Sequence, residues 1–134
     1  MHIEKNDNWL LLELSGDIDL VWVDDHRDEI QAALADCPPV VVIDLEQVRF
    51  MDSTGLSIVV HAYRHCMDGE VLILNPRHFV MRVFEVAGVD QLVTVVSDSA
   101  EVRAVYDQLV KGDSPVNAPL DRRRLVAEGP WTAQ

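Results

Sequence analysis

The sequence predicts an α/β domain in which a mixed, mostly parallel sheet of about five strands is covered by about four helices. Short apolar runs rich in β-branched residues alternate with segments whose apolar residues recur at helical spacing. The runs at 40–45 and 70–74 show no polar alternation, which is typical of strands covered on both faces. Helices between successive strands act as crossovers, so most neighbouring strands are expected to be parallel.

The first two strands are expected to form a hairpin. A short strand near Ile3 is followed at 6–8 by Asn-Asp-Asn, residues that favour turns. The apolar run at 9–14 is the second strand, and the Ser-Gly-Asp at 15–17 predicts a turn at its end.

Four segments have the spacing of amphipathic helices. The first spans 20–35, with Val23, Ile30 and Leu34 on one face, and Pro38-Pro39 stops it. The other three are expected at 54–67 with the stripe Leu56, Val59, Tyr63, at 79–87 with the stripe Phe79, Val83, Val86, and at 100–109 with the stripe Val102, Val105, Leu109. Gly88 is a plausible cap for the third helix, and a last strand is expected at 92–96.

Charge divides the chain into a body at 1–111 and a tail at 112–134. The body carries 20 acidic and 8 basic residues and so accounts for the whole net charge of −12. Such a surface repels phosphate backbones and anionic lipid, which argues against nucleic acid or membrane as the main partner. The Pro-containing tail is expected to be flexible, and its Arg122-Arg123-Arg124 run is interpreted as solvated, with docking on the acidic body or a partner as the alternative.

The two cysteines, Cys37 and Cys66, have no metal-type spacing and are too few for a secreted disulfide framework. We therefore expect reduced thiols in a cytoplasmic protein, consistent with an N-terminus that lacks signal-peptide features. His61 and His65 lie four residues apart, but no third ligand accompanies them, so no metal and no cofactor is predicted.

The loop after the strand at 40–45 is the most informative part of the sequence. It delivers Asp52, Ser53 and Thr54 to the start of a helix, at the edge of the sheet where α/β proteins place their sites. The local pattern alone favours a helix cap. Gly55 is expected to keep the first helical turn slim and open to a docking protein.

A wider pattern surrounds this loop. Its segments are Leu-Ser-Gly-Asp-Ile-Asp at 14–19, Val-Ile-Asp-Leu at 42–45, Phe-Met-Asp-Ser-Thr-Gly-Leu at 50–56, Pro76, and Arg-Val-Phe-Glu-Val-Ala-Gly-Val-Asp at 82–90. Over roughly residues 5 to 109 the chain thereby resembles the STAS family, and within it the bacterial anti-sigma-factor antagonists. The family often has Gly at the position of Ser57.

The resemblance implies a STAS fold and a protein that, when unphosphorylated, binds an anti-sigma factor of the GHKL serine kinase class. The kinase, with ATP and magnesium, would phosphorylate Ser53 and abolish binding, and a serine phosphatase would reverse the step. Thr54 is the second choice of acceptor. The partner-binding residues implied are Asp19, Asp52, Ser53, Thr54, Gly55, Leu56 and Ser57. A homodimer is left open.

Two other classes of function are alternatives to an anti-sigma-factor antagonist. A STAS subunit of a lipid-transport or stressosome-like complex would dock through the same face without a phosphate cycle. An enzyme is disfavoured, because Ser53 lacks the Gly-x-Ser-x-Gly context of a hydrolase and the chain has no phosphate-binding Gly-x-x-x-x-Gly-Lys loop.

Overall fold

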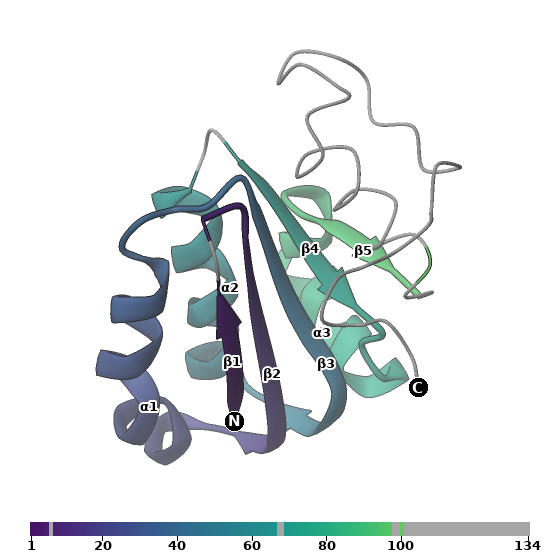
Figure 1. The fold of residues 1–134 in the computed structure, drawn as a ribbon. Helices are drawn as coiled ribbons and strands as arrows, with labels where there is room; N and C mark the ends of the chain where they lie inside the picture. The colour runs from purple at the N-terminus through teal and green to yellow at the C-terminus, as the bar shows by residue number, and fades with distance from the viewer. Residues whose placement is uncertain (6, 67–68, 98–99, 101–134) are drawn as a thin grey trace.

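The computed structural model of the chain describes residues 1–5, 7–66, 69–97 and 100. A five-stranded sheet in the order β1-β2-β3-β4-β5 forms the centre of the fold (Figure 1). The strands are β1 (His2–Lys5), β2 (Trp9–Ile18), β3 (Val40–Met51), β4 (Glu70–Leu74) and β5 (Thr94–Val96). The helices are α1 (Leu20–Leu34), α2 (Ser53–His65), α3 (His78–Ala87) and the short 3₁₀ helix η1 (Val89–Gln91).

The strand pairing confirms the predicted fold class. β1 and β2 are antiparallel, as expected for a hairpin, whereas β2–β3, β3–β4 and β4–β5 are all parallel. The predicted helix at 100–109 and the tail at 112–134, with its Arg122–Arg124 run, lie almost wholly outside the described residues.

Both faces of the central strands are apolar, which explains why their sequences do not alternate. One set of strand side chains packs with α1, α2 and α3, which lie together on one side of the sheet (Figure 1). This cluster includes Leu10, Leu12, Val41, Ile43 and Ile73 from the strands. The alternate residues form a second buried cluster on the opposite face, made of Trp9, Leu11, Val40, Val42, Leu72, Leu74 and Val96.

Two strands are longer than predicted. β2 continues through the expected turn at 15–17 and ends at Ile18, so the prediction of a turn there is wrong. β3 likewise continues past Leu45 to Met51. The added segments pair with each other, and register shifts at Glu13/Ser15 and Gly16/Asp17 keep them aligned. The extension carries both strand ends toward one edge of the sheet, where α1 and α2 begin.

The predicted buried stripe of α3 is also wrong. The helix buries Val80 and Phe84 against the sheet, while Phe79 and Val86 are 52% and 85% exposed. Gly88 does end the helix in a left-handed conformation with φ of 77°, as predicted. The chain then forms η1, and the last strand begins at Thr94 and not at residue 92.

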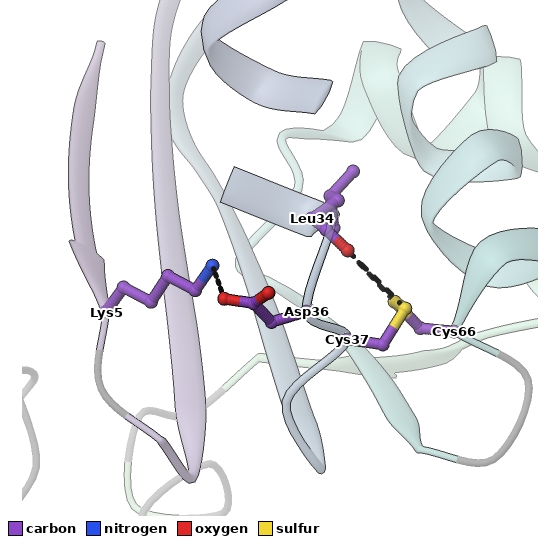
Figure 2. Close-up of polar contacts among 5 residues, drawn as sticks. All are labelled: Lys5, Leu34, Asp36, Cys37 and Cys66. Atoms are coloured by element: carbon purple, nitrogen blue, oxygen red, sulfur yellow. Dashed lines mark hydrogen bonds and ion pairs between the residues drawn. A yellow bond between two sulfur atoms is a disulfide. The ribbon is translucent and has the colours of Figure 1, made fainter. Parts of the chain in front are cut away.

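The expectation of two reduced thiols is contradicted. Cys37 and Cys66 form a disulfide, with their Cα atoms 5.2 Å apart, that joins the C-terminal ends of α1 and α2 (Figure 2). Lys5 donates to Asp36 beside it at 3.1 Å, which links β1 to the same corner (Figure 2). The prediction failed because it rested on cysteine number and compartment, whereas pairing depends on which helix ends meet in space.

None of the helices within the described ranges combines the length and apolar character needed to cross a membrane.

Candidate functional site

The candidate site lies where β2 and β3 end side by side. Each strand passes directly into a helix, and an aspartate occupies each junction. Asp19 caps α1 by accepting from the Trp22 amide at 3.0 Å. The Asp52 amide donates to the Ile18 carbonyl at 3.4 Å, which ties the two junctions together. Two helix N-termini, each with a half-buried carboxylate, therefore face the same edge of the sheet.

Asp52, and not Ser53, caps α2. Its Oδ1 accepts hydrogen bonds from the Thr54 amide at 2.9 Å and the Gly55 amide at 3.0 Å, which satisfies two of the free N–H groups at the helix start. A capping aspartate also places its negative charge at the positive end of the helix dipole. The helix start is therefore complete without any contribution from the neighbouring serine.

Ser53 is the first residue of α2 and is exposed. Within the described part of the chain its hydroxyl makes no hydrogen bond. A serine that is neither buried nor engaged in capping is accessible to an enzyme that modifies hydroxyl groups. The local interpretation of this loop as only a helix cap thus applies to Asp52, while Ser53 is available for another role.

The other hydroxyl groups of this turn are less available. Thr54 is half-buried. The exposed Ser57 donates its hydroxyl hydrogen bond to the Thr54 carbonyl. The extra hydroxyl that Ser57 brings to the turn is therefore engaged with the helix backbone.

Gly55 has a structural role that the sequence interpretation did not anticipate. It is buried, and a Cβ atom at this position would meet the Ile18 carbonyl oxygen, the Ile18 Cγ2 at 2.8 Å and the Met51 Cγ at 2.9 Å. Glycine is needed here because the first turn of α2 packs directly on the end of β2. The space that it leaves is filled by the domain's own strand and not by a docking protein.

An apolar groove adjoins Ser53, between α2 and α3. Its volume is about 380 Å³, and its lining consists of Ser53, Leu56, Phe79, Arg82, Val83, Val86 and Ala87. Phe50, 39% exposed, stacks on Phe79 with ring centroids 5.8 Å apart. Leu20 and Val21, at the start of α1 beside Asp19, are also exposed, at 55% and 66%.

This groove was not predicted, because the apolar stripe of Phe79, Val83 and Val86 was expected to face the core. The signal was nevertheless present, since α3 carries two apolar stripes and only one of them can face the sheet. Exposed apolar residues that gather around one groove are typical of a protein-binding surface. Together, Asp52, the hydroxyl of Ser53 and this groove form a surface suited to docking.

One ionisable group on β3, Asp44, lies in register with Glu13 of β2 and Leu74 of β4 and has a perturbed pKa. Partial burial raises the pKa of Asp44 on β3, and the nearby Glu13 and Glu46 carboxylates raise it further. The hydrogen bond that Asp44 Oδ1 accepts from the Glu46 amide, at 3.0 Å, opposes this shift. The Glu46 carbonyl in turn accepts from the Arg77 side chain at 2.8 Å, which anchors the connection between β4 and α3.

The chain is similar to known proteins both in sequence and in structure. The STAS domain model matches residues 1–102. An anti-sigma F factor antagonist of Lysinibacillus sphaericus is 30% identical over 82 residues, which cover 59% of this chain and 70% of that protein. The solved structure of the unphosphorylated anti-sigma factor antagonist SpoIIAA matches with a TM-score of 0.66 at 23% identity, over 83% of this chain and 96% of SpoIIAA. The phosphorylated form of Bacillus SpoIIAA matches with a TM-score of 0.59 at 22% identity, over 75% of this chain and 95% of that one.

Proposed function

The chain belongs to the STAS domain family, and on that premise we propose that it is an anti-sigma-factor antagonist switched by phosphorylation of Ser53. In its unphosphorylated form it binds an anti-sigma factor of the GHKL serine kinase class in the cytoplasm. The binding surface comprises Asp19, the residues Asp52 to Thr54 and the groove between α2 and α3. The antagonist itself carries out no catalysis.

The observation that carries this proposal is the division of roles between Asp52 and Ser53. Because Asp52 supplies the cap, the Ser53 hydroxyl stays exposed at the rim of an apolar groove and makes no hydrogen bond to any other described residue. An apolar side chain of the partner that enters the groove brings the partner's surface over Ser53. A modification of this one hydroxyl then falls inside the interface.

The chemistry of the switch is a phosphoryl transfer from ATP. The Ser53 Oγ bonds to the γ-phosphorus, the bond to the β-phosphate oxygen breaks, ADP leaves, and the hydroxyl proton passes to a base of the kinase. A serine phosphatase restores the hydroxyl by hydrolysis and releases inorganic phosphate. Thr54 is the poorer acceptor because it is half-buried.

The phosphate acts on the partner and not on the fold. It brings about −1.5 to −2 charges to a helix N-terminus, where the dipole favours an anion. In the interface, however, this charge is desolvated beside Asp52, and unpaired charge in an interface costs about 2 to 5 kcal/mol. That corresponds to a roughly 30- to 5000-fold loss of affinity.

The names of similar proteins support both the antagonist role and the switch by phosphorylation. The Lysinibacillus protein is described as an antagonist of an anti-sigma F factor. Solved structures named SpoIIAA include an unphosphorylated form and, from Bacillus, a phosphorylated form.

Incubation with candidate GHKL kinases, ATP and magnesium tests the proposal. The wild type should gain about 80 Da for one phosphate, whereas Ser53→Ala should gain none and should still bind the kinase. Ser57→Ala is the matched control, because it removes an exposed hydroxyl from the same turn and should leave phosphorylation intact. Ser53→Asp should weaken binding.

Full phosphorylation of Ser53→Ala would refute the choice of acceptor. Stable binding of the wild type to an ATPase without any serine modification would instead favour a scaffold subunit of a larger complex.

A further inference from the structure

The Cys37–Cys66 disulfide lies at the end of the α1–α2 pair away from Ser53. Cys37 follows α1 in a left-handed conformation with φ of 44°, and Cys66 is the C-cap of α2. The two residues are 29 positions apart in the chain, with a Cα–Cα distance of 5.2 Å. This distance lies within the usual range of about 4.4 to 6.8 Å for a disulfide, so the backbone need not move for the bond to close.

The same backbone also suits the reduced state, in which the disulfide is open and both cysteines are thiols. The Leu34 carbonyl oxygen lies 3.4 Å from the Cys37 Sγ and 3.9 Å from the Cys66 Sγ (Figure 2). The His65 carbonyl oxygen lies 3.1 Å from the Cys37 Sγ. Disulfide sulfurs have no proton to donate, but the two thiols formed by reduction would find these acceptors already in place.

Access to the two sulfurs differs. Cys37 is half-buried, whereas Cys66 is 3% exposed and belongs to the core. An incoming thiolate therefore reaches Cys37 first. No further cysteine exists in the chain to compete for either sulfur.

From these observations we propose that Cys37 and Cys66 are a reversible redox modification site, closed and opened by thiol–disulfide exchange with a small thiol couple of the glutathione class. For opening, a thiolate attacks the Cys37 sulfur, the disulfide breaks, and Cys66 leaves and takes up a proton. A second small thiol then attacks the mixed disulfide on Cys37, frees that thiol and releases the oxidised small disulfide. Closing runs the same steps in reverse, so two thiols are oxidised for each small disulfide reduced.

The helix ends set the rate of this exchange. Both cysteines lie at helix C-termini, where the dipole and the free carbonyl groups disfavour a thiolate. Exchange should therefore be slow near neutral pH and should accelerate as the pH rises. When closed, the bond holds the C-terminal ends of α1 and α2 together, at the opposite end of α2 from Ser53.

A redox titration of the wild-type chain tests the proposal. The protein is equilibrated at a series of reduced-to-oxidised glutathione ratios, quenched with acid, alkylated with N-ethylmaleimide and weighed intact. We expect a monomer that takes up two labels when open and none when closed, with the closed form about 2 Da lighter before labelling. The fraction of closed protein at each glutathione ratio should be the same whether the experiment starts from the reduced or from the oxidised protein. In single variants, Cys37 in Cys66→Ala should form the mixed disulfide faster than Cys66 in Cys37→Ala.

Three results would overturn the proposal. One is two free thiols in the air-oxidised monomer, and another is a disulfide found only between two chains. The third is a bond that excess dithiothreitol opens only after the protein is unfolded. Because the readout is the mass of the wild type, a variant that fails to fold does not affect the outcome.

Discussion

We infer that Asp52 caps α2 and that the Ser53 side chain contributes little to the stability of the fold. Measurements of stability alone test this division of roles. Asp52→Ala removes the acceptor of two backbone hydrogen bonds, of 2.9 and 3.0 Å, whereas Ser53→Ala removes a hydroxyl without a bond in the described structure. The two adjacent substitutions should therefore differ sharply. This difference is the physical basis of the proposed switch, because a residue required for the cap could not be modified without cost to the fold.

The magnitude for Asp52→Ala follows from two contributions. Loss of an N-cap side chain costs about 0.5 to 2 kcal/mol. Loss of the favourable charge at the helix dipole costs about 0.3 to 1 kcal/mol more when the site is partly exposed. We expect a total of about 0.8 to 3 kcal/mol, or a fall in Tm of roughly 3 to 15 °C for a domain of this size. Ser53→Ala should stay within about 0.5 kcal/mol of the wild type.

Urea unfolding at pH 7, followed by circular dichroism, measures the loss of stability in Asp52→Ala and in Ser53→Ala. The dependence of the unfolding free energy on urea concentration should have the same slope in both variants as in the wild type. Asp52→Asn serves as the matched variant, since its side-chain oxygen can keep the cap while the charge is lost. It should recover most of the stability that Asp52→Ala loses. If Ser53→Ala proved as destabilising as Asp52→Ala, the division of roles would be wrong and Ser53 would belong to the cap.

Four further predictions follow from single features of the structure. Gly55→Ala should destabilise the domain by about 1 to 3 kcal/mol in the same urea assay, because the added methyl group meets the backbone of β2; an unchanged midpoint would contradict the close packing of α2 on that strand. Replacing Cys37 and Cys66 together by serine should cost about 3.5 kcal/mol more under oxidising than under reducing conditions, which is the entropy of a loop of roughly 30 residues. Equal losses in both conditions would point to the burial of a hydroxyl at position 66, and not to the bond. Burial raises the pKa of Asp44 above 3.8, so the folded state binds this proton more tightly and ionisation lowers stability as the pH rises through that region. Asp44→Asn should therefore be more stable than the wild type at pH 7, with the gain lost below about pH 3.8; a gain that persists in acid would rule out this cause. Val86→Asp, at a site that is 85% exposed, should leave the urea midpoint unchanged but weaken kinase binding in a pull-down, and unaltered binding would exclude the groove from the interface.

Much of the fold could be predicted because its signals are local. The apolar run at 40–45 and the helical spacing of Val23, Ile30 and Leu34 each depend on near neighbours in sequence, and the structure confirms both elements. The position of the candidate loop was predictable for the same reason, since it joins a buried strand to an amphipathic helix.

The features that were missed depend on contacts between distant segments. The extension of β2 to Ile18 is stabilised by pairing with the end of β3, which no window of local sequence contains. The disulfide joins residues 29 positions apart. The face of α3 was misassigned because Val80 and Phe84 compete with a second apolar stripe, and spacing alone cannot decide which stripe meets the sheet.

That misassigned stripe changes how the proposed switch must work. A core position for Phe79 and Val86 would leave Ser53 on a polar surface, where a phosphate has only other solvated groups near it. With the stripe exposed beside Ser53, a partner docked as proposed would exclude water from the hydroxyl, and solvent would no longer screen a phosphate there. The same apolar contact that strengthens binding before modification therefore increases the electrostatic penalty after it. Val86→Asp should reduce both quantities together: weaker binding of the unmodified protein, and a smaller loss of affinity when Ser53 is phosphorylated. The affinity of the partner is measured for the unphosphorylated and the Ser53-phosphorylated protein, in the wild type and in Val86→Asp. If the two effects were simply additive, phosphorylation would reduce affinity by the same factor in the wild type and in the variant.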